Sequence, residues 1–211
     1  MKKLAVLLIL ALAMTFAYAQ DDYSNDKIQT IFSKQRSNGG YGAFTLSYSK
    51  IDGRDAFISG GRGAFIFDHS LAIGLGGYGF VNNIDYHTFL ENQPPDYSLA
   101  GGYGGIFVEP IIGGRMPVHL SFPILFGIGG AALIEDYGWN SWEYSHQYKQ
   151  YDYDVFFVIE PAIEIEFNLT RFFRTATAIS YRYTSKIDLF ETGENVLRGL
   201  NFGLTFKFGK F

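Results

Sequence analysis

Bulky apolar residues alternate with small or polar residues along most of the chain. Phe44, Leu46 and Tyr48 are separated by Thr and Ser, and the same two-residue period recurs in the segment NFGLTFKF at 201–208. Successive side chains of a β-strand point to opposite faces, so this pattern predicts strands with one bulky apolar face and one small or polar face. Eight such strands are expected, over residues 40–50, 55–67, 71–82, 98–112, 118–134, 155–168, 172–185 and 198–210.

The predicted strands and their connections have the lengths found in a membrane-spanning barrel. A tilted strand needs roughly 9–11 residues to cross a bilayer, and each predicted strand reaches that length. After a tight turn at Asp52-Gly53, short connections (68–70, 113–117, 169–171) alternate with long polar ones (83–97, 136–154, 186–197). This alternation and the even strand count are typical of outer-membrane barrels, whose chain ends lie beside the short turns. We therefore predict an all-β fold, an eight-stranded antiparallel up-and-down transmembrane β-barrel.

The composition of the two strand faces decides which of them lines the interior. A water-facing surface is about 25–35% charged, whereas the non-bulky face of these strands consists mostly of Gly, Ala, Ser and Thr. Small neutral side chains suit the narrow interior of an eight-stranded barrel, which leaves the aromatic face in contact with lipid. A soluble barrel, which would share the two-residue period, is therefore disfavoured.

One glycine-rich stretch carries a motif of dinucleotide-binding proteins. In LAIGLGGYGF at 71–80, Gly74, Gly76 and Gly79 spell G-x-G-x-x-G. That fingerprint requires a preceding strand and a following helix. No helical period follows Gly79, and the tetrapeptide GGYG recurs at 39–42 and 101–104. We interpret these glycines as part of a repeated strand pattern.

The chain begins with the three parts of a secretory signal peptide. Lys2 and Lys3 form a positive segment, residues 4–14 form an apolar one, and Ala17-Tyr18-Ala19 is a small-x-small cleavage site. We predict a signal peptide over 1–19 that is cleaved near Ala19, a short periplasmic segment over 20–38, and the barrel over 39–211. The predicted location is the bacterial outer membrane.

Composition excludes several classes of partner. The sequence has no Cys, which excludes disulfides, a lipid-anchored N-terminal Cys and zinc–thiolate sites. Without Lys2 and Lys3, 15 basic residues stand against 21 acidic ones, so nucleic acid is not an expected partner. His69, His87 and His146 lie on separate connections without metal-ligand spacing, and we predict neither a metal nor a cofactor.

Several segments resemble one protein family. GGRGAFIFDHSLAIGLGGYG, FVEPIIGG, VIEPAIEIEFNLTRFFRTATAISYRY and GLTFKFGKF are similar to segments of small Gram-negative outer-membrane β-barrel proteins. The likeness covers nearly the whole chain after the predicted signal peptide. It implies an eight-stranded barrel of the OmpA/OmpX size, inserted by the outer-membrane assembly machinery, and it implies no established activity.

A few positions depart from regular strands. The final Phe211 resembles the usual C-terminal aromatic signal but is out of phase with Phe202–Phe208, and we expect a bulge at Gly209 to restore the phase. Proline removes a hydrogen-bond donor from the sheet. Bulges are therefore also expected at three prolines inside predicted strands, which are Pro110, Pro123 and Pro161.

Charged residues on the predicted inner face concentrate on neighbouring strands. Glu160, Glu164 and Glu166 share one face of a single strand, and Arg174 and Arg182 share the inner face of the next. Buried carboxylates require partners. We therefore predict a salt-bridge network that closes the lumen, made by Arg62, Glu109, Glu160, Glu164, Glu166, Arg174, Arg182 and Lys207. Pairing of residue 168 with 172 would place Glu166 opposite Arg174. A glycosidase-type carboxylate pair is disfavoured, because such a pair needs an open sugar cleft.

His119 and Ser121 point to the same face and form a candidate catalytic pair. If the 113–117 turn sets the register, Glu109 lies opposite Ser121 and diagonal to His119, which gives a Ser/His/Glu arrangement. His-x-Ser also resembles the motif of outer-membrane lipid A deacylases. Those enzymes act on the outer leaflet, whereas this pair is predicted beside a periplasmic turn, facing inward. A hydrogen-bonded interior His is the favoured interpretation.

The connection at 136–154, DYGWNSWEYSHQYKQYDYD, is the richest in Tyr and Trp. Exposed Tyr and Trp are frequent in binding interfaces. This predicts an extracellular ligand site at Tyr137, Trp139, Trp142, Tyr144, Tyr148, Tyr151 and Tyr153. The alternative is an aromatic girdle that continues above the membrane.

These features favour a non-enzymatic barrel with a closed polar lumen, which contributes to the envelope or binds a ligand through its extracellular loops. The expected partners are the outer-membrane lipid bilayer, the assembly machinery and an extracellular ligand that the sequence does not identify. A lipid-modifying enzyme at His119 and Ser121 and a narrow solute channel are the alternatives.

Overall fold

The computed structural model describes residues 38–82, 96–136, 148–189 and 192–211. All regular secondary structure within these ranges is β-strand. None of the described residues belongs to a helix long and apolar enough to cross a membrane. The predicted signal peptide at 1–19 and the segment 20–37 lie outside the described residues.

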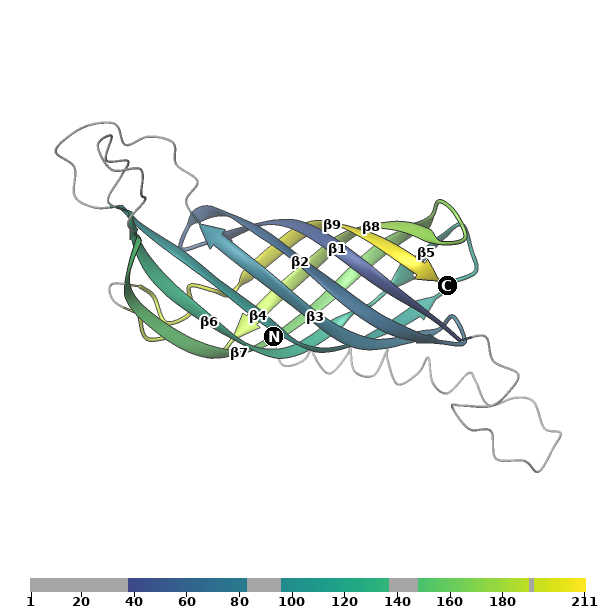
Figure 1. The fold of residues 1–211 in the computed structure, drawn as a ribbon, viewed down its shortest axis with the longest axis horizontal. Coiled ribbons are helices and arrows are strands. Elements are labelled where there is room, and N and C mark those ends of the chain that lie inside the picture. Colours follow the sequence, from purple (N-terminus) through teal and green to yellow (C-terminus); the bar gives the residue numbers. More distant parts are fainter. Residues whose placement is uncertain (1–37, 83–95, 137–147, 190–191) are drawn as a thin grey trace, which may run out of the picture. The chain divides into compact units, whose positions relative to one another are not determined.

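The strands form one antiparallel sheet that closes on itself (Figure 1). Strands that follow one another in the chain pair side by side, and the pairing of β1 with β9 joins the first strand to the last. The result is the predicted up-and-down barrel. The strands are β1 (Asn38–Ile51), β2 (Arg54–Phe67), β3 (Leu71–Asn82), β4 (Asp96–Ile112), β5 (Val118–Ser121), β6 (Ile124–Asp136), β7 (Tyr148–Asn168), β8 (Phe173–Thr184) and β9 (Gly199–Lys210).

β5 and β6 are two parts of the single strand predicted over 118–134. Phe122 and Pro123 leave the ladder between them. The register against β7 is nevertheless the same for both parts, and so is the register against β4. The barrel wall therefore has eight strands, as predicted.

The bulges expected at the three prolines are wrong. Instead of shifting the register, the prolines interrupt it, because they lack the N–H that the ladder needs. Phe122 N–H donates to the carbonyl of Pro110 (2.9 Å), and Ala162 N–H donates to the carbonyl of Pro123 (2.8 Å), so the gap is bridged on both sides. A two-residue interruption also preserves the side-chain phase. The register shift recorded along β6 and β7 lies elsewhere, between Leu133 and Ile134.

The two ends of the barrel differ in their connections. The turns at 68–70, 113–117 and 169–172 lie at the same end as the first and last residues of the sheet, since Asn38 pairs with Phe67 and Gly40 with Lys210. We call this the termini end and the opposite one the loop end. The β1–β2 turn at the loop end is tight, with φ of 56° at Asp52 and 71° at Gly53, the left-handed backbone that a type I′ hairpin turn requires.

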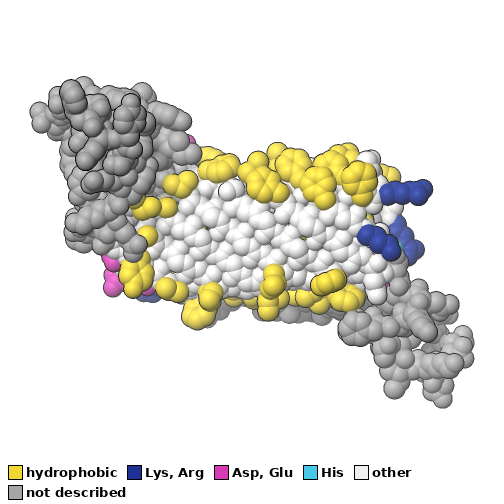
Figure 2. All heavy atoms as spheres, in the orientation of Figure 1, with side chains coloured by type: hydrophobic (Ala, Val, Ile, Leu, Met, Phe, Trp, Pro, Cys, Tyr) yellow, Lys and Arg dark blue, Asp and Glu magenta, His cyan; other side chains and the backbone are white. Residues whose placement is uncertain are grey.

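The two faces of the strands separate as predicted. Outward-facing side chains are bulky, apolar and exposed, as in Phe65 (74% exposed) and Phe157 (71% exposed). The inward-facing side chains of Thr205 and Ala176 are fully buried. Figure 2 shows apolar side chains bordering a broad smooth area of the wall. Outward-facing glycines contribute to the wall where Gly61 pairs with Gly77 on the neighbouring strand. An exterior made of apolar side chains and glycines is typical of proteins surrounded by lipid.

The G-x-G-x-x-G motif lies entirely within β3, as the strand interpretation predicts. A Cβ placed on Gly74 would come within 1.9 Å of the carbonyl oxygen of Gly63 on β2. Glycine at position 74 therefore allows β2 and β3 to approach closely, and the motif serves strand packing.

The bulge expected at Gly209 is absent. The register between β9 and β1 is constant from Asn201 to Lys210, so Phe211 keeps the inward phase. Its ring stacks on Tyr41, with 5.9 Å between ring centroids, and the guanidinium carbon of Arg174 lies 3.9 Å from the centroid of the Phe211 ring. These two inner residues hold the terminal aromatic ring at the lumen instead of on the lipid face.

Candidate functional site

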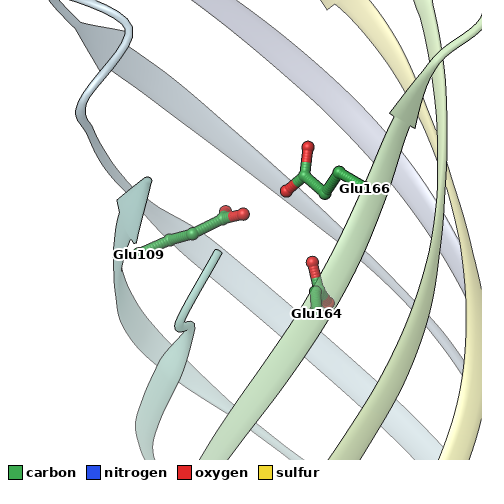
Figure 3. A group of neighbouring side chains, drawn as sticks. All are labelled: Glu109, Glu164 and Glu166. Carbon is green, nitrogen blue, oxygen red and sulfur yellow. The ribbon is translucent and has the colours of Figure 1, made fainter. Parts of the chain in front are cut away.

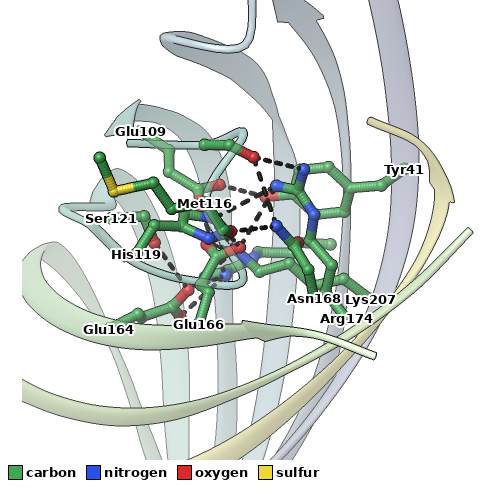
Figure 4. Close-up of polar contacts among 12 residues, drawn as sticks. Tyr41, Glu109, Met116, His119, Ser121, Glu164, Glu166, Asn168, Arg174 and Lys207 are labelled. Carbon is green, nitrogen blue, oxygen red and sulfur yellow. Dashed lines mark hydrogen bonds and ion pairs between the residues drawn. The ribbon is translucent and has the colours of Figure 1, made fainter. Parts of the chain in front are cut away.

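A cluster of charged and polar side chains fills the lumen near the termini end (Figure 4). Its members come from strands all around the wall, and each is more than nine-tenths buried. We call this cluster the lumen network. It consists of Tyr41 on β1, Arg62 on β2, Glu109 on β4, His119 and Ser121 on β5, Glu164 and Glu166 on β7, Arg174 on β8 and Lys207 on β9.

Lys207 lies at the centre of three carboxylates. Its Nζ is 2.5 Å from Glu109 Oε1, 2.9 Å from Glu164 Oε2 and 2.5 Å from Glu166 Oε1. Figure 3 shows the three glutamates converging on the same region of the lumen, and one oxygen of each lies within 4.8 Å of the others. Such a carboxylate triad has the geometry of a cation site, and the three N–H donors of the Lys207 ammonium match its three acceptors.

Arg62 completes the contacts of Glu164. Its Nη2 donates to both carboxylate oxygens of Glu164, at 2.8 and 2.7 Å. The guanidinium carbon lies 5.4 Å from the centroid of the Phe107 ring, so the cation also packs against an aromatic face. Tyr41 donates its hydroxyl hydrogen to Glu109. The lumen network therefore ties β1, β2, β4, β7 and β9 together across the interior.

Glu166 is shared by His119 and Arg174. Its Oε2 lies 3.0 Å from His119 Nε2 and 3.6 Å from Arg174 Nη1. The register that was predicted to place Glu166 directly opposite Arg174 is wrong by two residues, since Glu166 faces Ala176 and Arg174 faces Asn168. The turn begins at Leu169 as predicted but ends one residue later, at Phe172, and Leu169 N–H donates to the carbonyl of Phe173. The ion pair is therefore diagonal.

The Ser/His/Glu arrangement considered as a catalytic alternative does not form. Ser121 lies opposite Ile111, and not opposite Glu109. Its hydroxyl donates to Glu164 Oε2 at 3.2 Å, while His119 contacts Glu166 and Arg174. A Ser nucleophile needs a base within hydrogen-bond reach, and here each of the two side chains is engaged with a different carboxylate.

The charges of the lumen network balance. Three carboxylates (Glu109, Glu164, Glu166) are matched by three permanent cations (Arg62, Arg174, Lys207). Breaking one buried ion pair in a protein typically costs about 3–5 kcal/mol, because the remaining partner stays buried without compensation. This balance of charge stabilises the polar lumen of the barrel.

Two of the eight residues predicted for the network lie apart from it. Glu160 accepts hydrogen bonds from Tyr103, Ser180 and Asn201, at 2.6, 2.5 and 2.8 Å. Arg182 donates from Nε to the carbonyl of Leu197 at 2.7 Å and packs against aromatic rings. The other six predicted residues belong to the lumen network.

A small cavity lies beside the lumen network, in the middle of the barrel. Its volume is about 50 Å³, and its lining includes Thr45, Tyr103, Glu160, Asn201 and Thr205. One water molecule needs about 10–15 Å³ of such space. The cavity therefore accommodates a few water molecules, and it is too small for a sugar or an amino acid.

An apolar cluster lies inside the barrel toward the loop end. The connection between β8 and β9 folds over the barrel and buries Ile187, Leu189 and Leu197, which are 2%, 4% and 0% exposed. Ile187 N–H bonds to the carbonyl of Glu194, at 3.0 Å, within the same connection. We call this cluster the apolar plug. It is made by Ile51, Ile58, Leu99, Leu133, Val158, Ile187, Leu189 and Leu197.

The apolar plug was not predicted. The segment 186–197 was expected to be a long polar connection, whereas Ile187, Leu189 and Leu197 belong to the core. The four apolar residues Ile187, Leu189, Val196 and Leu197 were the signal that could have shown this. They lack a regular period, because they lie on an irregular segment and not on a strand.

The aromatic segment at 136–154 is only partly a loop. β6 extends to Asp136 and β7 begins at Tyr148, so the connection is 137–147 and lies outside the described residues. Tyr137, Trp139, Trp142 and Tyr144 fall within it. Tyr148, Tyr151 and Tyr153 belong to β7, and the side chain of Tyr153 is 67% exposed.

Comparison with known proteins identifies the fold. No protein-family model matches the sequence, and neither does any curated protein sequence. Among solved structures, the Neisserial surface protein A (NspA) matches with a TM-score of 0.54 and 12% identity, over 82% of this chain and 97% of that one. The fold is that of a small outer-membrane β-barrel. Ail of Yersinia pestis also matches, with a TM-score of 0.44 and 15% identity over 83% of this chain and 99% of that one.

Proposed function

We propose that this chain is a non-enzymatic outer-membrane barrel with a lumen closed to solutes, and that it acts in the envelope or binds a ligand at its loop end. The closed lumen carries the proposal. A solute would have to pass both the lumen network and the apolar plug, whose members are almost fully buried. A barrel closed by its own side chains offers its outer surface and its loops as the remaining functional parts.

The proposed location is supported by the apolar exterior and by the predicted export signal. The bare aromatic and aliphatic wall suits the hydrocarbon of a bilayer, and the signal peptide predicted at 1–19 would deliver the chain across the inner membrane. Insertion would then depend on the outer-membrane assembly machinery. In this arrangement the termini end faces the periplasm and the loop end faces the outside of the cell.

The proposed binding surface is the aromatic segment at the loop end. Trp139 and Trp142 lie on the longest predicted connection, and Tyr153 stands exposed on β7 where that connection joins the barrel. Tyr and Trp supply large contact areas at small entropic cost, which suits a protein or glycan ligand. The catalytic alternative receives no support from the lumen, where His119 and Ser121 contact separate glutamates.

Two measurements on the full protein test this proposal. Fractionated cells should hold the protein in the outer membrane, as a band whose gel migration shifts on boiling. Trp139 and Trp142 should be quenched by acrylamide and hardly at all by brominated lipid chains. A water-soluble protein would refute the location. Quenching by brominated lipid alone would instead assign the two tryptophans to a girdle and remove the proposed binding surface.

A further inference from the structure

Three exposed cations lie at the termini end, on neighbouring segments of the rim. Arg115 belongs to the β4–β5 turn, Arg171 to the β7–β8 turn, and Lys210 is the last residue of β9. We call these three residues the basic arc. Figure 2 shows Lys and Arg side chains projecting from this end of the barrel, beyond the apolar wall. Asp68, on the remaining turn, is the one acidic side chain at this rim among the described residues.

Backbone and side-chain hydrogen bonds join the segments that carry the basic arc. Asn168 N–H donates to the carbonyl of Pro117 at 2.8 Å, and Asn168 Nδ2 donates to the carbonyl of Met116 at 2.5 Å, which fastens the first turn to β7. Gly209 N–H donates to the carbonyl of Phe172 at 2.9 Å, which fastens β9 to the second turn. The backbones that hold the three cations are therefore fixed relative to one another before any partner binds.

The cations of the two ends differ in their pairing. At the loop end, Lys50 pairs with Asp55 at 3.8 Å, and Lys186 pairs with Glu194. In the described part of the chain, the members of the basic arc have neither an ion pair nor a side-chain hydrogen bond. Burial and the positive charge of Arg115 also lower the pKa of His69, on the neighbouring turn. Among the described residues, the termini end therefore presents three cations without a carboxylate partner.

Exposed apolar side chains lie directly beside the basic arc. Met116 is 61% exposed, Leu169 57% and Phe172 63%, and all three belong to the same turns as the arginines. A surface that combines bare apolar side chains with unpaired cations fits the boundary between acyl chains and headgroups. Guanidinium groups are also well suited to contact phosphate oxygens.

We propose that the basic arc is a binding surface for anionic phospholipid headgroups in the leaflet that faces the termini end. This inference rests on the proposed function, because it requires that the barrel spans the outer membrane with its termini end at the periplasm. The apolar neighbours favour a lipid over free phosphate, since they would pack against the acyl chains of the same molecule. The barrel thereby gathers phosphatidylglycerol-type lipids around one side of its periplasmic rim.

The test compares lipid retention by the full protein reconstituted in mixed phosphatidylglycerol and phosphatidylcholine bilayers. Native mass spectrometry after gentle extraction counts the lipids of each class that stay bound. Each Lys or Arg near an anionic surface strengthens association about fivefold. The triple variant R115Q/R171Q/K210Q should therefore lose phosphatidylglycerol preference by at least about tenfold at low salt. The control variant K50Q/K186Q, which removes paired cations at the loop end, should keep it.

Other results would overturn the inference. Equal phosphatidylglycerol retention by the wild type and the triple variant would show that the basic arc does not bind lipid. If inorganic phosphate competed with bound phosphatidylglycerol as effectively as added phosphatidylglycerol does, the basic arc would be a site for small anions and not for lipids. If the triple variant fails to fold, the single variants Arg115→Gln and Arg171→Gln replace it in the test. Each of them should lose part of the phosphatidylglycerol preference. Failure to insert into any bilayer would refute the proposed location instead.

Discussion

Lys207 is the residue whose removal should damage the lumen most. Lys207→Met replaces the ammonium by an unbranched apolar side chain one heavy atom shorter, so packing is largely retained and most of the loss reports the missing charge. Three buried carboxylates would then face two cations, Arg62 and Arg174. Removing one partner of a buried pair costs about 3–5 kcal/mol, and Lys207 contacts all three glutamates at 2.5 to 2.9 Å. We expect Lys207→Met to lower the free energy of unfolding by about 4 kcal/mol, in the middle of that range.

The assay is equilibrium unfolding of the reconstituted barrel in urea, followed by tryptophan fluorescence and by the gel shift on boiling. With a slope of about 2 kcal/mol per molar urea, Lys207→Met should lower the midpoint by about 2 M. Lys210→Met is the matched control, because Lys210 lies three residues further along and is exposed. It should leave the midpoint almost unchanged.

Two further variants separate charge from packing. Adding Glu109→Gln to Lys207→Met restores equal numbers of buried charges and should recover part of the loss. Ca²⁺ should stabilise Lys207→Met but not the wild type, because the glutamate oxygens within 4.8 Å of one another then lack their ammonium. A Lys207→Met barrel as stable as the Lys210→Met control would refute the reasoning, and so would strictly additive losses in the double variant.

Three other perturbations test neighbouring parts of the account. Glu166→Ala should lower the urea midpoint, and adding Arg174→Ala should recover part of it, because the two charges lie 3.6 Å apart; independent effects in that cycle would argue against the diagonal pair. Leu197→Ala should lose about 2–5 kcal/mol in thermal unfolding, since Leu197 is fully buried in the apolar plug; a loss below about 1 kcal/mol would contradict that packing. Burial and the charge of Arg115 lower the pKa of His69, so protonation favours the unfolded chain, and the wild type should lose stability as the pH falls below about 6.5. His69→Gln should lose less over that range, and an unchanged pH profile would show that His69 does not contribute.

The strand pattern and the polarity of its faces could be predicted from the sequence because the two-residue period is strong where one face is buried. The side chains that belong to the lumen network followed from the same parity, since Glu164, Glu166, Arg174 and Lys207 all occupy inward positions. Strand count was equally accessible, although Phe122 and Pro123 divide one strand into two.

Register and irregular packing could not be predicted in the same way. The pairing of β7 with β8 depends on the turn, where Thr170 Oγ1 accepts hydrogen bonds from the N–H groups of Phe172 and Phe173. Parity alone leaves such a pairing uncertain by two residues. The apolar plug and the inward position of Phe211 depend on contacts between segments far apart in the chain, which no local period encodes.

Planar-bilayer recording of the purified, reconstituted protein tests the central claim most directly. The gel shift on boiling shows that the barrel in the same sample is folded, so silence in the recording cannot come from unfolded protein. The account predicts no conductance steps for the wild type in concentrated KCl, because the lumen network and the apolar plug close the lumen in series. Stable steps from the folded wild type would contradict a closed lumen and establish a solute channel.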